Sequence, residues 1–141
     1  MKFRPPALPQ DIAALENLLE VKFPIDLREL LSESNGVMDC MQYKQEWMEI
    51  GWLLWPVAEI QKQITWFRSN TVYRGYETRF DDFLFFAGAG FDGIVFGYSI
   101  ASSKVKQDGI YVWYPIRDMA NMVVSSLEAF IDEWIGGKLP I

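Results

Sequence analysis

Histidine is absent from this chain of 141 residues, and cysteine occurs once, at Cys40. The missing imidazole removes the commonest general base, the usual partner of a serine or cysteine nucleophile, and the commonest metal ligand. A single thiol can form neither an internal disulfide nor a zinc cage. We therefore expect no enzyme of the common classes, no metal and no other cofactor. Catalysis by carboxylates alone stays open, and it predicts a deep pocket with at least two close carboxyl groups.

Long apolar runs are missing too, since no stretch approaches the ~20 residues that cross a bilayer. The N-terminal sequence MKFRPPALPQD has charges and prolines but no apolar signal-peptide core, so we expect a cytoplasmic protein with no membrane contact. The net charge of −6 disfavours nucleic acid as a partner and would speed association with a basic protein. The same charge would also simply keep a very aromatic protein soluble.

What the chain does contain is apolar residues, at 50%, and aromatic residues, at 16%, which suffice for a packed core. The spacing of its apolar residues and the positions of its helix-ending and turn residues predict one α+β domain over residues 1–141. An N-terminal helix pair is expected over 10–21 and 24–34, with Pro24 opening its second helix and Asn35-Gly36 closing it in the left-handed conformation.

The rest of the pattern predicts strands with two further helices packed on them. Apolar runs typical of strands occupy 38–43, 47–54, 83–87, 94–100 and 110–114. Their short connections indicate one central, mainly antiparallel sheet of about five strands. A middle helix is expected from Pro56 to Arg68, followed by a loop over 69–79. A C-terminal helix follows, where Ser125 and Glu128 have the spacing of a capping box.

Two motifs that suggest chemistry are better explained as structure. Gly88 to Gly93 reads GxGxxG after a strand, but the next residues, IVFGYSI, are not helical, so we reject a dinucleotide site in favour of a glycine-rich β-turn. Asp81-Asp82 and Asp92 could place carboxylates at one end of the sheet. Their spacing lacks the ligand density of a calcium loop, and we favour solvated turn residues.

Basic residues alternate with aromatic residues between 67 and 80, a pattern that can form a platform for single-stranded nucleic acid. The positions concerned are Phe67, Arg68, Tyr73, Arg74, Tyr76, Arg79 and Phe80. The neighbouring acidic residues oppose that function. We favour aromatic rings that pack inward beneath arginines that reach outward.

Three tryptophans lie on or beside one predicted hairpin: Trp47, Trp52 and Trp55. Strict alternation places Trp52 on the face of Ile50 and Trp47 on the other face, unless a bulge intervenes. Both faces are therefore apolar. We favour burial of both, because tryptophan is mostly buried on average. The alternative keeps one face for a partner, since aromatic residues dominate binding hot spots.

The order of these pieces resembles the SUKH superfamily, the SMI/KNR-like proteins. The resemblance covers about residues 8 to 135. It begins with a helix, a proline break and a helix that ends in Asn-Gly. A Trp-Pro turn into a middle helix, a glycine-rich turn and the closing helix SLEAFI come next. The signature positions, to which we assign a structural role, are Pro24, Asn35, Gly36, Trp55, Pro56, Gly88 and Gly93.

The resemblance implies a non-catalytic α+β protein. It implies an immunity protein that binds and neutralises a cognate, nuclease-type toxin, whose contacts are expected to be basic. The alternative is a general interaction or regulatory module like the fungal cell-wall regulators. Partner contacts cannot be carried over by motif, and the oligomeric state is not indicated. Our own hypothesis for the contact residues is acidic and aromatic side chains near strand ends: Glu46, Glu49, Trp52, Asp81, Asp82 and Asp92.

Overall fold

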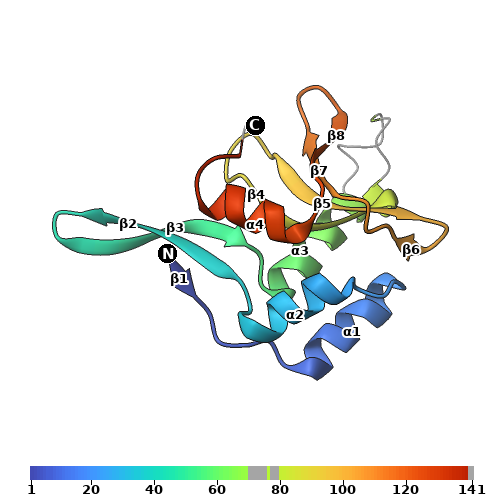
Figure 1. The fold of residues 1–141 in the computed structure, drawn as a ribbon, viewed down its shortest axis with the longest axis horizontal. Coiled ribbons are helices and arrows are strands. Elements are labelled where there is room, and N and C mark those ends of the chain that lie inside the picture. The colour runs from blue at the N-terminus through green and yellow to red at the C-terminus, as the bar shows by residue number, and fades with distance from the viewer. Residues whose placement is uncertain (70–75, 77–79, 140–141) are drawn as a thin grey trace.

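The computed structural model describes residues 1–69, 76 and 80–139 (Figure 1). The helices within these residues are α1 (Pro9–Leu19), α2 (Ile25–Glu33), α3 (Val57–Ser69), α4 (Leu127–Ile135) and the short 3-10 helix η2 (Phe80–Asp82). The strands are β1 (Lys2–Phe3), β2 (Val37–Tyr43), β3 (Glu46–Leu54), β4 (Phe83–Gly88), β5 (Val95–Ala101), β6 (Lys104–Val105), β7 (Ile110–Tyr114) and β8 (Met119–Val124). The predicted α+β class is confirmed.

The strands form two antiparallel sheets, whereas the sequence suggested one. A three-stranded sheet has the order β1-β2-β3, and a five-stranded sheet has the order β4-β5-β7-β8, with β6 paired to β5. The five runs predicted from the sequence are divided between the two. The short strands β1 and β6 and the strand β8 were not predicted. Strand β8, MANMVV, does not alternate apolar and polar residues, so its sequence gives no strand signal, and in the structure none of its residues is fully buried.

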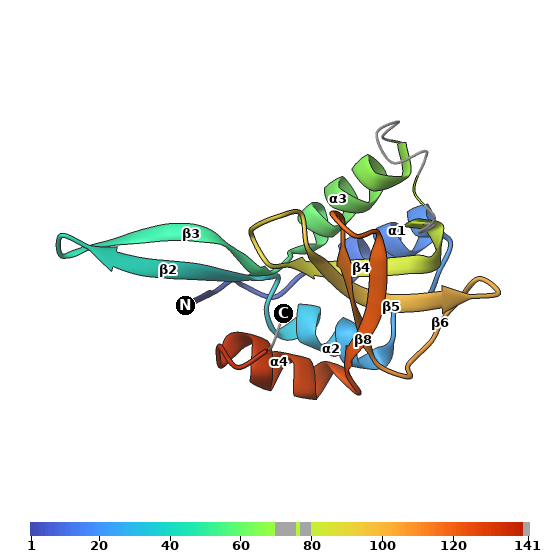
Figure 2. The same ribbon diagram turned by 90° about the horizontal axis from the view of Figure 1, so that it is seen from above.

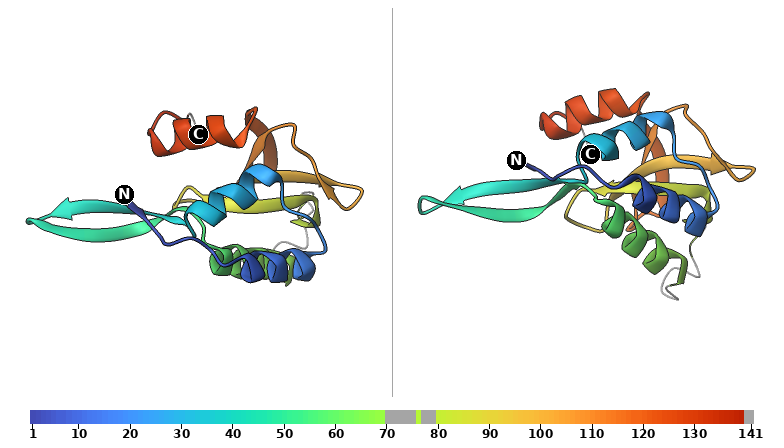
Figure 3. Two further views of the ribbon diagram at one scale, coloured as in Figure 1. Left: turned by 60° about the horizontal axis from the view of Figure 1, so that its bottom comes forward. Right: turned by 90° about the horizontal axis from the view of Figure 1, so that it is seen from below.

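Helices cover both faces of the five-stranded sheet, with α1 and α3 on one side and α2 and α4 on the other (Figures 2 and 3). Neighbouring residues of β4 serve the two layers, because successive side chains of a strand point to opposite faces. The ring centroid of Phe85 lies 5.6 Å from that of Phe67 on α3. Phe86 lies 5.5 Å from Phe130 on α4. The aromatic content thus fills two core layers.

Several helix ends differ from the prediction. Helix α1 stops at Leu19 rather than at residue 21, and α2 begins at Ile25 with Pro24 as its N-cap. Helix α2 stops at Glu33, Ser34 is extended at φ −149°, and the left-handed conformation expected for Asn35 is absent. The cap of α4 is Ser126 rather than Ser125: the Ser126 hydroxyl accepts a 3.1 Å hydrogen bond from the amide of Ala129. These last two errors each shift a cap by one residue, because neighbouring polar residues offered equivalent caps.

Several signature residues contact one another. The Asn35 side-chain oxygen accepts a 2.8 Å hydrogen bond from the Val57 amide, so it caps α3 rather than closing α2. Gly36, at φ +95°, lies so close to Pro56 that a Cβ there would meet the proline ring at 2.8 Å. The break after α2 and the start of α3 therefore form one joint.

The alternating basic and aromatic residues between 67 and 80 lie partly outside the described residues, which exclude Tyr73, Arg74 and Arg79. Phe67 and Phe80 are buried and stack with centroids 5.0 Å apart. This part of the pattern packs inward as expected. No helix in the described part of the chain combines the length and apolarity that crossing a membrane requires.

Candidate protein-binding surface

The β2–β3 hairpin extends away from the helices as an arm, which we define as residues 37–54 (Figures 1 and 2). Lys44 and Gln45 form its two-residue turn with φ of 51° and 66°, as a tight hairpin turn requires. Every residue from Met41 to Gly51 is exposed. A hairpin this rich in large apolar residues ordinarily lies against a core or a partner.

The expectation that both faces of this hairpin are buried is wrong. Trp47 is 71% exposed and Ile50 is 57% exposed, while Trp55, just beyond the arm, is buried at 6%. The physical reason is that only the base of the arm, near Leu54, reaches the helices. Local sequence could not show that none of the described helices covers the distal half of the hairpin.

The bulge that the sequence allowed in this hairpin is present. Gly51 pairs with Asp39, but Glu49 pairs with Cys40, so Ile50 is an extra residue on β3. Cross-strand partners share a face, and the bulge therefore moves Trp47 onto the face of Trp52. The opposite face displays its own apolar pair, Met41 beside Met48.

The base of the arm is anchored on several sides. The Trp134 indole N–H of α4 donates a 2.8 Å hydrogen bond to the Leu53 carbonyl. Glu49 accepts charged contacts from Lys2 at 3.5 Å and Arg4 at 3.3 Å. The Arg4 guanidinium also lies 5.2 Å from the Trp52 ring centroid. Two of the hypothesised contact residues, Glu49 and Trp52, thus hold the N-terminal segment on one face of the arm.

The other hypothesised acidic residues are dispersed. Glu46 lies beside the turn of the arm. Asp81 lies 3.4 Å from Arg68, and the exposed Asp82 follows it in η2. These two precede β4 whereas Asp92 follows it, so they flank opposite ends of a six-residue strand, about 20 Å apart. The idea that they converge at one end of the sheet is therefore wrong.

A denser acidic surface, not anticipated from the sequence, lies between α2 and α4. Its groove is lined by eight residues, none of them basic: Asp26, Glu29, Leu30, Glu33, Leu127, Glu128, Ile131 and Asp132. The sequence did carry a partial signal. The acids occur at helical spacing on each helix, at i, i+3 and i+7 on α2 and at i and i+4 on α4. Only the packing of the two helices brings both sets together.

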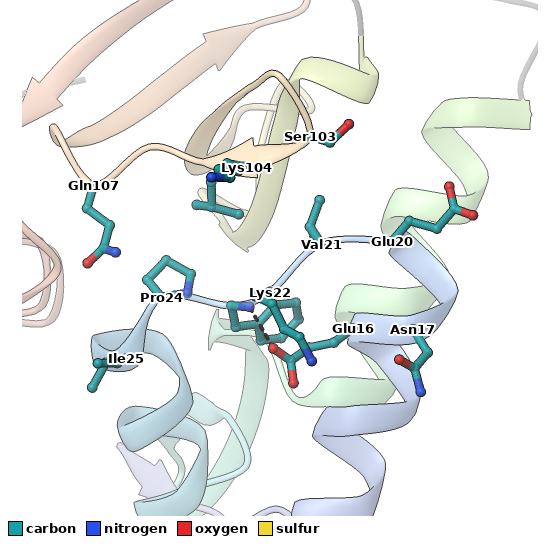
Figure 4. Close-up of a pocket in the computed structure, with 12 residues that line it drawn as sticks. Glu16, Asn17, Glu20, Val21, Lys22, Pro24, Ile25, Ser103, Lys104 and Gln107 are labelled. Carbon is teal, nitrogen blue, oxygen red and sulfur yellow. Dashed lines mark hydrogen bonds between the residues drawn. The ribbon is translucent and has the colours of Figure 1, made fainter.

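A hollow of about 650 Å³ separates the α1–α2 connection from the β5–β6 hairpin (Figure 4). The buried carboxylate in its wall is Glu16, which accepts a 2.8 Å hydrogen bond from the Phe23 amide and a 2.9 Å bond from Arg28. This acid holds the helix pair together. The other lining acid, Glu20, is exposed, so the described wall offers no pair of buried carboxyl groups. In the described part of the chain, no three Cys, Asp or Glu residues are grouped to hold a metal ion.

The structure is that of an α+β protein with two antiparallel sheets and a pair of N-terminal helices. Its exposed arm and its acidic α2–α4 groove both lie at the surface. Residues 6–133 match the family model described as the SMI1 / KNR4 family (SUKH-1). The chain therefore belongs to this family, as the resemblance implied. No curated protein matches the sequence. Membership suggests a role in protein–protein interaction.

Proposed function

We propose that this protein is a non-catalytic immunity protein that binds a basic toxin domain in the cytoplasm and neutralises it by occlusion. The observation that carries the proposal is the arm, whose apolar side chains are exposed on both faces. Family membership is compatible with this role and with an SMI1/KNR4-like regulatory role. Both roles use a partner protein.

The arm offers enough apolar surface for a tight contact. Trp47 and Ile50 are 71% and 57% exposed, and covering each contributes about 1.5–3 kcal/mol. Association and side-chain ordering offset part of that gain, so a few such anchors carry most of the affinity. Glu46 lies on the same strand beside the turn, whereas Glu49 on that strand is already paired with Lys2 and Arg4. An acidic group next to the Trp47 anchor favours a partner whose contact surface is basic.

Charge on the body of the protein supports the same kind of partner. The α2–α4 groove contains five carboxylates and no lysine or arginine. Together with the net charge of −6, it would attract a basic domain before contact. We expect the association rate constant to fall about tenfold or more when the salt concentration rises from about 0.05 to 0.5 M, with a smaller change in dissociation.

The test is rescue of growth. A toxin-like reading frame adjacent to the gene is expressed in a bacterial host with and without this protein, and the purified pair is analysed by size-exclusion chromatography. We expect wild-type protein to restore growth and to elute with the toxin. Trp47→Gln together with Ile50→Gln should weaken binding at least a hundredfold, because both anchors are lost.

Leu18→Gln is the matched control, since Leu18 on α1 is 56% exposed, almost the same as Ile50. It should leave rescue intact. Failure of the wild-type protein to bind or neutralise any toxin encoded beside it would contradict the immunity function and leave the regulatory role. Full rescue by the double variant would instead remove the arm from the binding surface.

A further inference from the structure

An aromatic hollow opens at the base of the arm, where three separate elements meet. Trp52 of β3, Trp66 of α3 and Phe91 of the β4–β5 turn line a space of about 400 Å³. Trp66 is 46% exposed and Phe91 is 54% exposed. Solvent therefore reaches about half of each of these side chains, while the Trp66 ring also packs edge-on against Phe67 with centroids 5.2 Å apart.

The glycine-rich turn shapes this hollow, which gives the GxGxxG sequence a physical role. A Cβ at Gly88 would lie 3.1 Å from the Trp55 ring, so glycine lets the turn lie against that tryptophan. Gly90 and Asp92 adopt φ of +85° and +53°. The turn reverses the chain tightly enough to present Phe91 and Asp92 at the edge of the hollow, opposite α3.

The charged group among the residues that line the hollow is a carboxylate, that of Asp92. Asp92 makes no ion pair with any described residue, and none of the lining residues is a lysine or arginine. Gln63 of α3 donates one of its two amide N–H groups to Glu59 at 2.8 Å, and its carbonyl oxygen can accept a further hydrogen bond. Arg117 shares a neighbouring hollow with Asp92 but lies beyond ion-pair distance of it. An aromatic wall with a carboxylate at its edge suits a cation.

We propose that this hollow binds the guanidinium group of an arginine side chain presented by the protein partner. The inference rests on the proposed function and names the anchor that the partner supplies. A planar guanidinium stacks on aromatic rings and pairs with a carboxylate through two hydrogen bonds, whereas lysine offers a smaller, more strongly hydrated charge. Trp52 already has one guanidinium near its ring, that of Arg4.

The probe is N-acetyl-arginine methylamide, titrated into the full chain and followed by NMR at the tryptophan indole N–H resonances. Trp66→Phe assigns the resonance of Trp66. The matched control is N-acetyl-citrulline methylamide, which has nearly the same shape without the charge. We expect saturable shifts of the Trp66 and Trp52 resonances, with arginine binding about tenfold tighter than citrulline because it forms a charged hydrogen bond. Equal affinities would overturn the inference, as would tighter binding of N-acetyl-lysine methylamide.

Asp92→Asn tests the carboxylate while keeping a residue that tolerates positive φ. It should remove the preference for arginine over citrulline, and Asp82→Asn, an exposed acid in η2, should not. Unchanged discrimination in Asp92→Asn would overturn the assignment. Unchanged circular dichroism and melting temperature show that both variants are folded.

This titration needs no toxin, so the two proposals fail separately. Binding of the arginine probe without growth rescue keeps the site and removes the immunity function. Growth rescue with wild-type toxin affinity in Asp92→Asn keeps the function and removes the site.

Discussion

The capping of α3 by Asn35 gives a prediction in which one of two similar substitutions destabilises the protein and the other does not. Asn35→Ala removes the acceptor of a 2.8 Å hydrogen bond from the amide of Val57, which is buried. A lost cap costs about 1–2 kcal/mol, and an amide left buried without a partner places this case near the upper value. For a domain of this size, we expect the melting temperature to fall by about 3–6 °C.

Asn35→Asp keeps an acceptor at the same position and adds a negative charge at the N-terminal end of α3. That charge interacts favourably with the helix dipole by about 0.3–1 kcal/mol. We therefore expect stability within about 0.5 kcal/mol of wild type, or above it. Urea unfolding followed by tryptophan fluorescence gives the free energy of unfolding for each variant.

Ser126→Ala is the reference for an ordinary cap, because the Ser126 hydroxyl caps α4 in an exposed position at 3.1 Å. It should cost about 0.5–1 kcal/mol, less than Asn35→Ala. If Asn35→Asp destabilises as much as Asn35→Ala, shape rather than capping governs this position, and the reasoning is refuted.

Three further predictions concern stability. Burial, with a smaller contribution from Asp26, raises the pKa of Tyr98. The free energy of unfolding therefore does not depend on this hydroxyl below about pH 10, and it falls above that pH by up to ~1.4 kcal/mol per pH unit as the unfolded chain ionises first. Tyr98→Phe should abolish this alkaline loss without lowering stability at pH 7, because the buried hydroxyl has no hydrogen-bond partner among the described residues; a variant that still unfolds in parallel with wild type would contradict this. Glu16→Gln keeps an acceptor and should cost about 1 kcal/mol, whereas Glu16→Ala should cost about 3 kcal/mol; equal losses in urea unfolding would mean that the hydrogen bonds to Glu16 contribute little. Gly36→Ala combines a φ of +95° with a steric overlap and should cost about 2–4 kcal/mol, so a melting temperature near that of wild type would exclude the close packing described for this joint.

Local patterns in the sequence predicted those helices, strands and turns whose own residues carry the signal. Helical spacing predicted α3 within one residue at each end, and a short run of β-branched and aromatic residues predicted β7 at its observed bounds. The turn residues Lys44 and Gln45 were anticipated as a turn between two strands. Such features depend on side chains a few positions apart, which the sequence displays directly.

The candidate site required information that no local pattern contains. Whether Trp47 is buried depends on whether another element covers the distal half of the arm, and no element within the described residues does. The Ile50 bulge changes the face on which Trp47 lies, although the letters of the sequence are compatible with either register. The acidic α2–α4 groove and the aromatic hollow join residues separated by up to about a hundred positions.

By itself, the sequence determined the α+β class, most helix and strand positions, and an acidic chain without histidine. Propensity and periodicity are properties of short segments, and net charge is a property of the whole composition. The tertiary structure decided which aromatic and acidic side chains remain at the surface and which of them meet. Exposure and proximity are set by the packing of distant segments, where burial of the whole core outweighs the preference of any one residue.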